Sequence, residues 1–179
     1  MVNKPMSKIM FMGMSLVLKC RDIFRSRENI LREVTIKPNS KVLDFGCGPG
    51  SYITHVSKTV GENGKVYALD IHPLAVKKVN GIVSKLRLLN VETICSDCAT
   101  GLPDREIDIV LLYDTFHMLG DKKKVLLEIH RVLKDDGILS FSDHHMKEKD
   151  ILSEMRKSNL FELRKKNRRT HSFVKEMQA

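Results

Sequence analysis

Three glycines and two acids have the most informative spacing in this 179-residue chain. Asp44 is followed by Gly46, Gly48 and Gly50 at alternate positions, and Asp70 comes twenty residues after the last glycine. Glycines let the backbone pass close to a ligand where a Cβ atom would clash. An acid at this distance is placed to accept hydrogen bonds from ribose hydroxyls. The spacing therefore indicates a site for a nucleotide-like ligand.

The segments around these residues have the patterns of a strand, a turn and a helix. Val42, Leu43 and Phe45 form a short apolar run that suits a strand buried on both faces. Apolar residues at helical spacing follow the glycines over 51–60, and a second apolar strand over 66–70 ends in the acid. A strand, a glycine turn and a helix in this order open a nucleotide-binding α/β domain.

The glycine spacing separates two families of such domains. A dinucleotide fingerprint reads G-x-G-x-x-G, whereas this chain reads G-x-G-x-G from Gly46, with Ser51 where the last glycine would stand. The pattern D-x-G-x-G-x-G instead resembles motif I of the class I S-adenosylmethionine (SAM) methyltransferases. A dehydrogenase and a non-catalytic α/β domain are the alternatives.

The resemblance implies residues that hold SAM and its product S-adenosylhomocysteine. The ammonium and carboxylate of the methionine part need polar partners, which the motif supplies from Asp44 and from the backbone of Gly46, Gly48 and Gly50. Asp70 matches the acid that binds the ribose, and a solvated loop acid is the alternative reading of this residue.

Further residues after the second, third and fourth strands match the rest of the cofactor site. Ile71 resembles the apolar residue that packs against the adenine. Asp97 resembles the acceptor for the adenine amino group, with Cys98 beside it. Asp114 is a candidate contact for the methionine part or for the methyl acceptor.

Methyl transfer requires alignment more than bond activation. Because the sulfonium of SAM already activates the methyl group, the protein mainly aligns a nucleophile, and it supplies a base where the acceptor loses a proton. His117 is our first candidate for that base or for an acceptor contact, His144 is the second, and Tyr113 is a further candidate. A polar residue of the cleft wall is the alternative reading of each histidine.

We predict no metal site. His117, His144 and His145 are of a residue type that suits zinc, but adjacent histidines in a strand point to opposite faces. Cys95 and Cys98 form a single C-x-x-C pair without a second half. A thiol-handling acceptor site, as in arsenite methyltransferases, stays open as a variant.

The whole pattern predicts five strand–helix units and a closing hairpin. Residues 128–139 are similar to the E-x-x-R-V-L-K-P-G-G-x-L segment of the family, with Asp135 and Asp136 forming a turn in place of Pro-Gly. The resemblance implies an α/β fold with a seven-stranded, mostly parallel, doubly wound sheet of order 3-2-1-4-5-7-6 and helices on both faces. The expected strands are 41–45, 65–70, 91–95, 107–113, 138–142, 160–166 and 171–176, and the expected helices are 51–60, 73–88, 121–133 and 147–159.

An apolar segment over 9–18 precedes this core. It is similar to the central region of a signal peptide, but it is too short to span a bilayer and no small-residue cleavage site follows. We expect a helix from Ser7 to about Cys20 and a second amphipathic segment over 22–34.

The family resemblance gives these segments a place in a single domain. It implies an N-terminal helical cap over 1–37 on a Rossmann-like core over 38–179. Met10, Met12 and Met14 would then line a soft, adaptable acceptor site. Their burial as core residues is the favoured alternative.

Composition bounds the class and the compartment. A chain that is 42% hydrophobic and 30% charged suits one soluble globular domain. The net charge of +9 allows RNA, a membrane surface or an anionic substrate as a partner, although a solvated basic surface is the favoured explanation. Four unevenly placed cysteines do not outline a disulfide framework, so we predict the cytoplasm.

The motifs that are absent narrow the acceptor. The strand over 107–113 is not followed by the [DNS]-P-P-[YFW] motif of enzymes that methylate exocyclic base nitrogens, and no Pro-Cys dipeptide supplies a cytosine nucleophile. The residues from Asp114 to His117 resemble the group that includes quinone, sterol and arsenite methyltransferases, which favours a small-molecule acceptor. RNA methylation, with the basic run over 164–169 as a docking turn, and a catalytically silent SAM-binding module are the alternatives.

Overall fold

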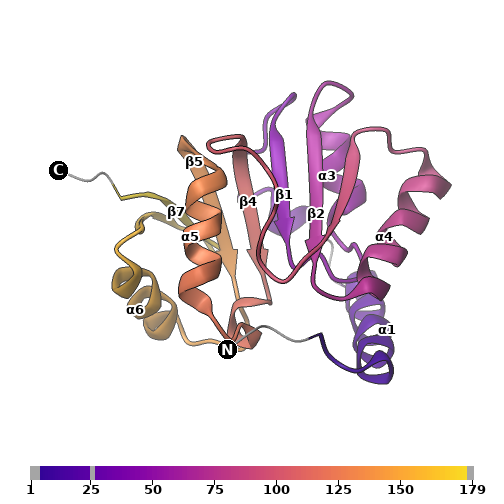
Figure 1. Ribbon diagram of the computed structural model, residues 1–179, viewed down its shortest axis with the longest axis horizontal. Coiled ribbons are helices and arrows are strands. Elements are labelled where there is room, and N and C mark those ends of the chain that lie inside the picture. The colour runs from indigo at the N-terminus through magenta and orange to yellow at the C-terminus, as the bar shows by residue number, and fades with distance from the viewer. Residues whose placement is uncertain (1–4, 25–26, 177–179) are drawn as a thin grey trace.

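The computed structural model describes residues 5–24 and 27–176, with the backbone alone over 18–24, and contains a seven-stranded sheet. The strands lie in the order β3-β2-β1-β4-β5-β7-β6 (Figure 1), which confirms the predicted order. The first five strands are parallel to one another, whereas β7 is antiparallel to both β5 and β6. The strands are β1 Lys41–Phe45, β2 Lys65–Asp70, β3 Val91–Cys95, β4 Ile107–Tyr113, β5 Leu133–Ser142, β6 Phe161–Lys166 and β7 His171–Lys175.

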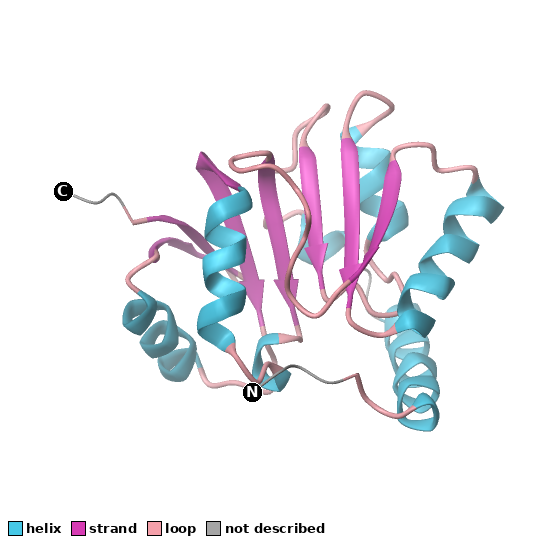
Figure 2. Ribbon diagram, viewed as in Figure 1, coloured by secondary structure: helices cyan, strands magenta, loops and turns pink. Residues whose placement is uncertain are grey.

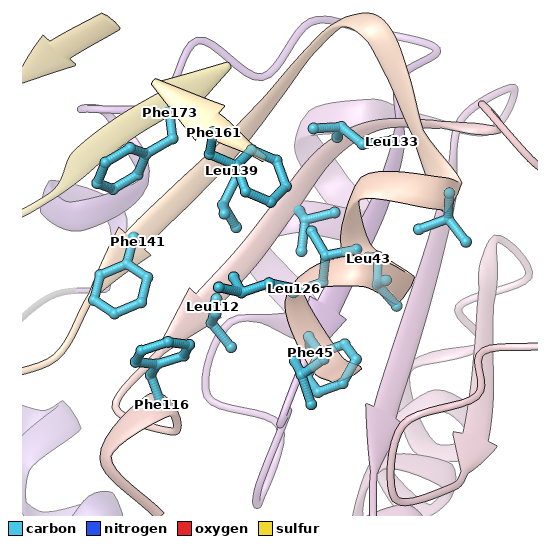
Figure 3. Close-up of a cluster of buried hydrophobic side chains, with 14 of the residues drawn as sticks. Leu43, Phe45, Leu112, Phe116, Leu126, Leu133, Leu139, Phe141, Phe161 and Phe173 are labelled. Atoms are coloured by element: carbon cyan, nitrogen blue, oxygen red, sulfur yellow. The ribbon is translucent and has the colours of Figure 1, made fainter. Parts of the chain in front are cut away.

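Helices cover both faces of the sheet (Figure 2), as a doubly wound fold requires. Alternate residues of β1 point to opposite sides. Leu43 and Phe45 belong to a cluster that includes side chains of α5 and α6 (Figure 3), whereas Val42 packs in a second cluster with α3 and α4. The helices are α1 Lys8–Phe24, α2 Glu28–Leu31, α3 Ile53–Val60, α4 Pro73–Leu86, the 3-10 turn η1 Phe116–Met118, α5 Lys122–Val132 and α6 Glu148–Ser158.

The N-terminal helices differ from the prediction. The helix α1 continues past Cys20 to Phe24 and so takes in the first residues of the expected segment over 22–34, and the helix α2 within that segment is a single turn. The reason is that neither glycine nor proline follows Gly13 within α1 to end the helix. Met10 and Met12 are each 63% exposed, so the expectation that they are core residues is wrong.

Two later boundaries also differ. The helix α4 ends at Leu86, before the expected residue 88, because its C-cap Arg87 has the left-handed conformation, and Leu86 and Leu89 are exposed. The predicted turn around Asp135 and Asp136 lies inside β5, at a register shift where the extra residues bulge out of the pairing with β4.

The segment resembling E-x-x-R has a structural role in this fold. Glu128 accepts hydrogen bonds from the backbone N–H and the hydroxyl of Thr100 at 2.8 and 2.6 Å. Arg131 donates to both carboxylate oxygens of Glu128, at 2.8 and 2.9 Å, and to the carbonyl of Leu102. These hydrogen bonds, led by those from Arg131, lower the pKa of Glu128 to about 2. The pair therefore ties the long loop between β3 and β4 to α5.

The basic hairpin turn is attached to the N-terminal segment. The carboxylate of Glu33 accepts hydrogen bonds from the backbone N–H groups of Arg169 and Thr170, each at 2.9 Å. The side-chain amide of Asn167 donates a hydrogen bond to the backbone carbonyl of Glu33 at 3.3 Å. The basic side chains of the turn remain exposed.

Candidate functional site

The carboxyl ends of the parallel strands meet at one edge of the sheet, where they line a cavity of about 520 Å³. Helix α1 closes one side of it, at the foot of α4 in Figure 1. Of the residues predicted from sequence to bind the cofactor or the acceptor, the cavity wall includes Asp44, Gly46, Gly48, Asp70, Ile71, Asp97, Tyr113, Asp114, His117 and His144.

The glycine turn has the backbone that its sequence predicts. Gly46, Gly48 and Gly50 all have positive φ angles, of 83°, 51° and 87°. A Cβ atom at Gly46 would stand 2.4 Å from the hydroxyl of Thr115, whereas one at Gly48 would meet nothing within 4 Å. Gly46 therefore permits close packing of two loops, Gly48 faces open space beside the cavity, and Gly50 packs toward α4 instead of lining the cavity.

Asp44 is a buried carboxyl that lacks a full set of partners. Its side chain is 2% exposed, and its Oδ2 atom makes no hydrogen bond within the described residues. Burial, together with the charge of Asp70, raises the pKa of Asp44 to about 7. A buried acceptor in this state favours a cationic ligand group, because a cation would stabilise the ionised form.

Asp70 links the glycine turn to the start of α4. Its Oδ2 accepts a hydrogen bond from the N–H of Gly48 at 2.8 Å, and its Oδ1 accepts one from the N–H of His72 at 2.7 Å. Burial raises the pKa of Asp70, and these two hydrogen bonds oppose the rise. A carboxylate has lone pairs left after two such bonds, so the acid can also accept from ligand hydroxyls.

The third strand end places its two candidates differently. Asp97 lies on the cavity wall, with the ammonium of Lys124 at 3.7 Å from its carboxylate. Cys98 is only 1% exposed and its thiol donates to the carbonyl of Lys124 at 3.6 Å, inside the hydrophobic core. The structure therefore brings Asp97 to the cavity and does not bring the Cys98 side chain there.

Phe11 and His72 are site residues to which sequence reasoning assigned no role. The ring of His72 caps α4 by accepting a hydrogen bond from the N–H of Leu74 at 3.1 Å. Phe11 of α1 stacks on this ring at 4.4 Å, and both side chains line the cavity. The sequence signals for His72 were its place directly after the second strand, beside Asp70 and Ile71, and its position before Pro73, where a cap is expected.

The second half of the cavity is built on two carboxylate–imidazole pairs. His117 Nδ1 lies 2.9 Å from the buried carboxylate of Asp143, which also accepts the backbone N–H of His117. His144 Nδ1 lies 2.6 Å from the carboxylate of Asp114. Each pair fixes one ring nitrogen and thereby the tautomer and orientation of the imidazole.

A third imidazole lies between the two pairs. The ring of His145 is 4.3 Å from that of His117 and 3.9 Å from that of His144. Its backbone N–H donates to Asp143 at 3.1 Å. Asp143, which directly precedes His144, therefore organises two of the three histidines. This role could not be read from the sequence because the pairing with His117 depends on η1.

Tyr113 lies on the same wall with its hydroxyl already engaged. The hydroxyl forms a 2.7 Å hydrogen bond with Ser140 of the neighbouring strand. Burial raises the pKa of Tyr113, so the phenol stays neutral. This geometry gives the tyrosine a place in the wall, with Tyr52 packed edge-on against it at 5.1 Å.

Metal-binding and membrane-spanning features are both absent from the described residues. In this part of the chain, no group of three or more histidine, cysteine, aspartate or glutamate side chains is arranged to hold a metal ion. Within the same residues, none of the helices has the length and apolar character needed to cross a membrane.

Comparison with known proteins agrees with this geometry. The sequence profile of a family described as a methyltransferase domain matches residues 36–177. This chain belongs to that methyltransferase family. The match covers the whole sheet, from the segment before β1 to the end of β7, and so confirms the resemblance carried by the glycine motif.

Individual relatives of the methyltransferase domain cover different parts of it. A demethylmenaquinone methyltransferase of Geobacillus stearothermophilus is 30% identical over 70% of this chain and 54% of its own length. A ribosomal RNA large subunit methyltransferase E of Desulfatibacillum aliphaticivorans is 41% identical, but over only 30% of this chain and 26% of its own. The crystal structure of a SAM-dependent methyltransferase from Aquifex aeolicus superposes with a TM-score of 0.76 at 28% identity, over 85% of this chain and 90% of that one. The chain spans about half the length of the demethylmenaquinone methyltransferases that it matches.

Proposed function

We propose that this protein binds SAM and transfers its methyl group to a small-molecule acceptor. The observation that carries the proposal is the single cavity that joins the glycine turn and its acids to the two carboxylate–imidazole pairs. Cofactor-binding groups and proton-accepting groups therefore face the same space. Similarity to the SAM-dependent methyltransferase from Aquifex aeolicus supports the choice of cofactor.

The residues at the glycine turn fit the methionine part of SAM. The unpartnered Oδ2 of Asp44 matches an ammonium group, and the open space at Gly48 leaves room for ligand atoms against the backbone. Asp70 would accept from the ribose hydroxyls with its remaining lone pairs. Ile71 and Asp97 would receive the adenine, since both line the cavity beyond Asp70.

The two histidine pairs supply what methyl transfer still needs. Bound SAM provides an activated methyl group, so the protein has to orient the acceptor and remove a proton from it where one is lost. With Nδ1 of His117 held by Asp143, its Nε2 is the ring nitrogen left to take that proton, and the buried carboxylate stabilises the resulting imidazolium. The His117 side chain is 26% exposed, compared with 60% for His144, which favours His117 as the base.

The wall between these groups is largely apolar. Met10 and Met14 of α1 line the cavity together with Phe11, Met118 and Leu119, whereas Met12 does not. Methionine side chains adapt to irregular apolar ligands. Together with the demethylmenaquinone methyltransferase relatives, this wall supports an acceptor with an apolar body and one ionisable atom.

Two other functions are distinguishable by experiment. The local match to a ribosomal RNA methyltransferase, together with the exposed basic turn over 164–169, favours RNA as the second candidate acceptor. A catalytically silent SAM-binding module would use the same glycine turn without the histidine pairs.

The free thiols of Cys47, Cys95 and Cys98 support a reducing compartment, and we place the protein in the cytoplasm on that ground.

The test is transfer of tritium from methyl-labelled SAM into a host-cell extract that is then separated into RNA, protein and small molecules. We expect label in the small-molecule fraction, and less of it with His117→Ala. Label in RNA would replace the small-molecule proposal with the second candidate. Absence of label, with S-adenosylhomocysteine binding shown by calorimetry, would leave only the binding module.

A further inference from the structure

The outer face of α1 is apolar and exposed to an unusual degree. Five of the ten exposed large apolar side chains in the described part of the chain lie on this one helix: Ile9 at 86%, Met10 and Met12 at 63%, Leu16 at 64% and Val17 at 67%. At about 100° per residue, these side chains cover roughly 160° of the helix circumference, with Gly13 among them. A continuous apolar face of this kind marks an interaction site.

The opposite face of α1 is already packed on the protein. Phe11 is 1% exposed and stacks on His72, and Ser15 is also buried at 1%. The exposed apolar face is therefore not the side that holds the helix in place. Within the exposed face, Met10 and Val17 also line the cavity, whereas Ile9, Met12 and Leu16 do not.

Basic side chains lie near this helix. Lys8, directly before Ile9 in α1, is exposed, and α4 contains Lys77, Lys78 and Lys85 and no acid. The two helices lie against each other, since the ammonium of Lys78 in α4 is 5.1 Å from the ring centroid of Phe11 in α1. An apolar helix face with a basic surround is the pattern of helices that lie in the plane of a bilayer surface.

We propose that the outer face of α1 docks on the surface of a membrane that contains anionic lipids, with Ile9, Met12 and Leu16 inserted among the acyl chains. Lys8 and the lysines of α4 attract the lipid headgroups, and the inserted side chains provide the apolar contact. Because Met10 and Val17 continue from this face into the cavity wall, docking places the cavity entrance at the lipid surface. An apolar acceptor would then enter the cavity without crossing water. This consequence rests on the proposed function, but the docking of α1 on the membrane does not rest on it.

The experiment measures co-sedimentation of the full chain with vesicles of phosphatidylcholine and phosphatidylglycerol at a 3:1 ratio, and with vesicles of phosphatidylcholine alone. We expect binding to the anionic vesicles that weakens in high salt. The double variant Ile9→Gln/Leu16→Gln should lower the affinity for these vesicles by a factor of about ten or more. Neither residue lines the cavity, so binding of S-adenosylhomocysteine should be unchanged and shows that the variant folds.

The matched control is Leu89→Gln/Leu127→Gln, which changes two exposed leucines, at 95% and 47%, outside α1 and the cavity wall. This variant should bind vesicles as the unchanged protein does. Equal vesicle binding by the α1 variant, or no binding by the unchanged protein, would overturn the proposal. A dimer in analytical ultracentrifugation that the α1 variant converts to monomer, without vesicle binding, would overturn it in favour of a second copy on this face.

Discussion

Replacing Asp44 with asparagine should stabilise the ligand-free protein and weaken its binding of the cofactor. The carboxyl is buried, its Oδ2 has no hydrogen-bond partner within the described residues, and burial raises its pKa to about 7. Asparagine has nearly the same volume and removes the charge without leaving a cavity. The two effects have opposite signs because the group that costs stability is the group that we propose binds the ammonium of SAM.

The effect on stability follows from the raised pKa. An aspartate in the unfolded chain ionises near pH 3.9, so the folded protein holds this proton more tightly and loses stability as the pH rises from about 4 to about 7. Above that range the loss is about 4 kcal/mol. The melting temperature of Asp44→Asn should therefore exceed that of the unchanged protein by about 10 °C near pH 8, and the difference should fall toward zero near pH 4. Circular dichroism melts across this range measure it.

The effect on binding follows from the same ionisation. Below pH 7 most of the Asp44 carboxyl is protonated in the free protein, so binding of an ammonium has to release a proton. The affinity for S-adenosylhomocysteine, which has the same amino-acid end as SAM, should rise more than tenfold between about pH 5.5 and 7. Calorimetry in two buffers of different protonation enthalpy counts the released proton. Asp44→Asn keeps the histidines of the cavity and should lose this part of the pH dependence.

A matched acid outside the cavity provides the control. Asp108 accepts hydrogen bonds from the backbone N–H of Lys41 at 2.7 Å and from the ammonium of Lys134 at 2.6 Å. Asp108→Asn should lower the melting temperature and leave the binding of S-adenosylhomocysteine unchanged. An Asp44→Asn variant that is less stable than the unchanged protein near pH 8, or that binds the ligand equally well with the same pH dependence, would refute the reasoning.

Three further predictions test other parts of the site and the fold. Asp70→Ala should weaken binding of S-adenosylhomocysteine tenfold or more, through loss of hydrogen bonds worth about 1.5–3 kcal/mol, and an unchanged dissociation constant in calorimetry would remove the ribose assignment. His117→Ala should keep that affinity for S-adenosylhomocysteine and lower kcat. Adding Asp143→Asn to this variant should slow single turnover no further, because the carboxylate acts through the ring. A further, additive loss of rate in the double variant would show that the two residues act independently. Glu128→Gln should lower the free energy of unfolding by roughly 2 kcal/mol near pH 7, because the pKa of Glu128 is lowered to about 2 in the folded protein. The carboxylate stabilises the folded protein above the unfolded pKa of about 4.3, and this stabilisation is lost as the pH falls through about 2. Urea titrations that find the same loss of stability in Glu128→Gln at both ends of this pH range would contradict the prediction.

The sequence predicted the conformation of the glycine turn and the position of Asp70 because their geometry is local. The turn from Gly46 to Gly50 follows from glycine spacing after a buried strand, and Asp70 follows from the end of the next strand. The fold brings these two segments together by a parallel pairing that the strand–helix–strand order dictates. The sheet order was predictable from the family resemblance for the same reason.

The half of the cavity that contains the histidines was less predictable because it depends on contacts between distant segments. The pairing of His117 with Asp143 requires that η1 turn back over the end of β5, which no local pattern in residues 116–118 indicates. Cys98 directly follows the candidate Asp97, yet its thiol turns into the core toward α5. The exposure of Met12 likewise depends on which side of α1 packs against His72, and a helix that is apolar all round does not reveal that side.

Four of the five acids at the strand ends divide the cavity into two chemically different halves, and Asp97 is the fifth. Asp114 and Asp143 each hold an imidazole, so their charge is directed to histidines that can take a proton. Asp44 and Asp70 make no ion pair with lysine or arginine within the described residues, and burial raises the pKa of both. A ligand with an ammonium at one end therefore has one favourable direction, with its cationic end at the glycine turn. In the proposed reaction, the opposite end of the cavity receives an acceptor that gives up a proton, as methyl transfer to an ionisable small molecule requires.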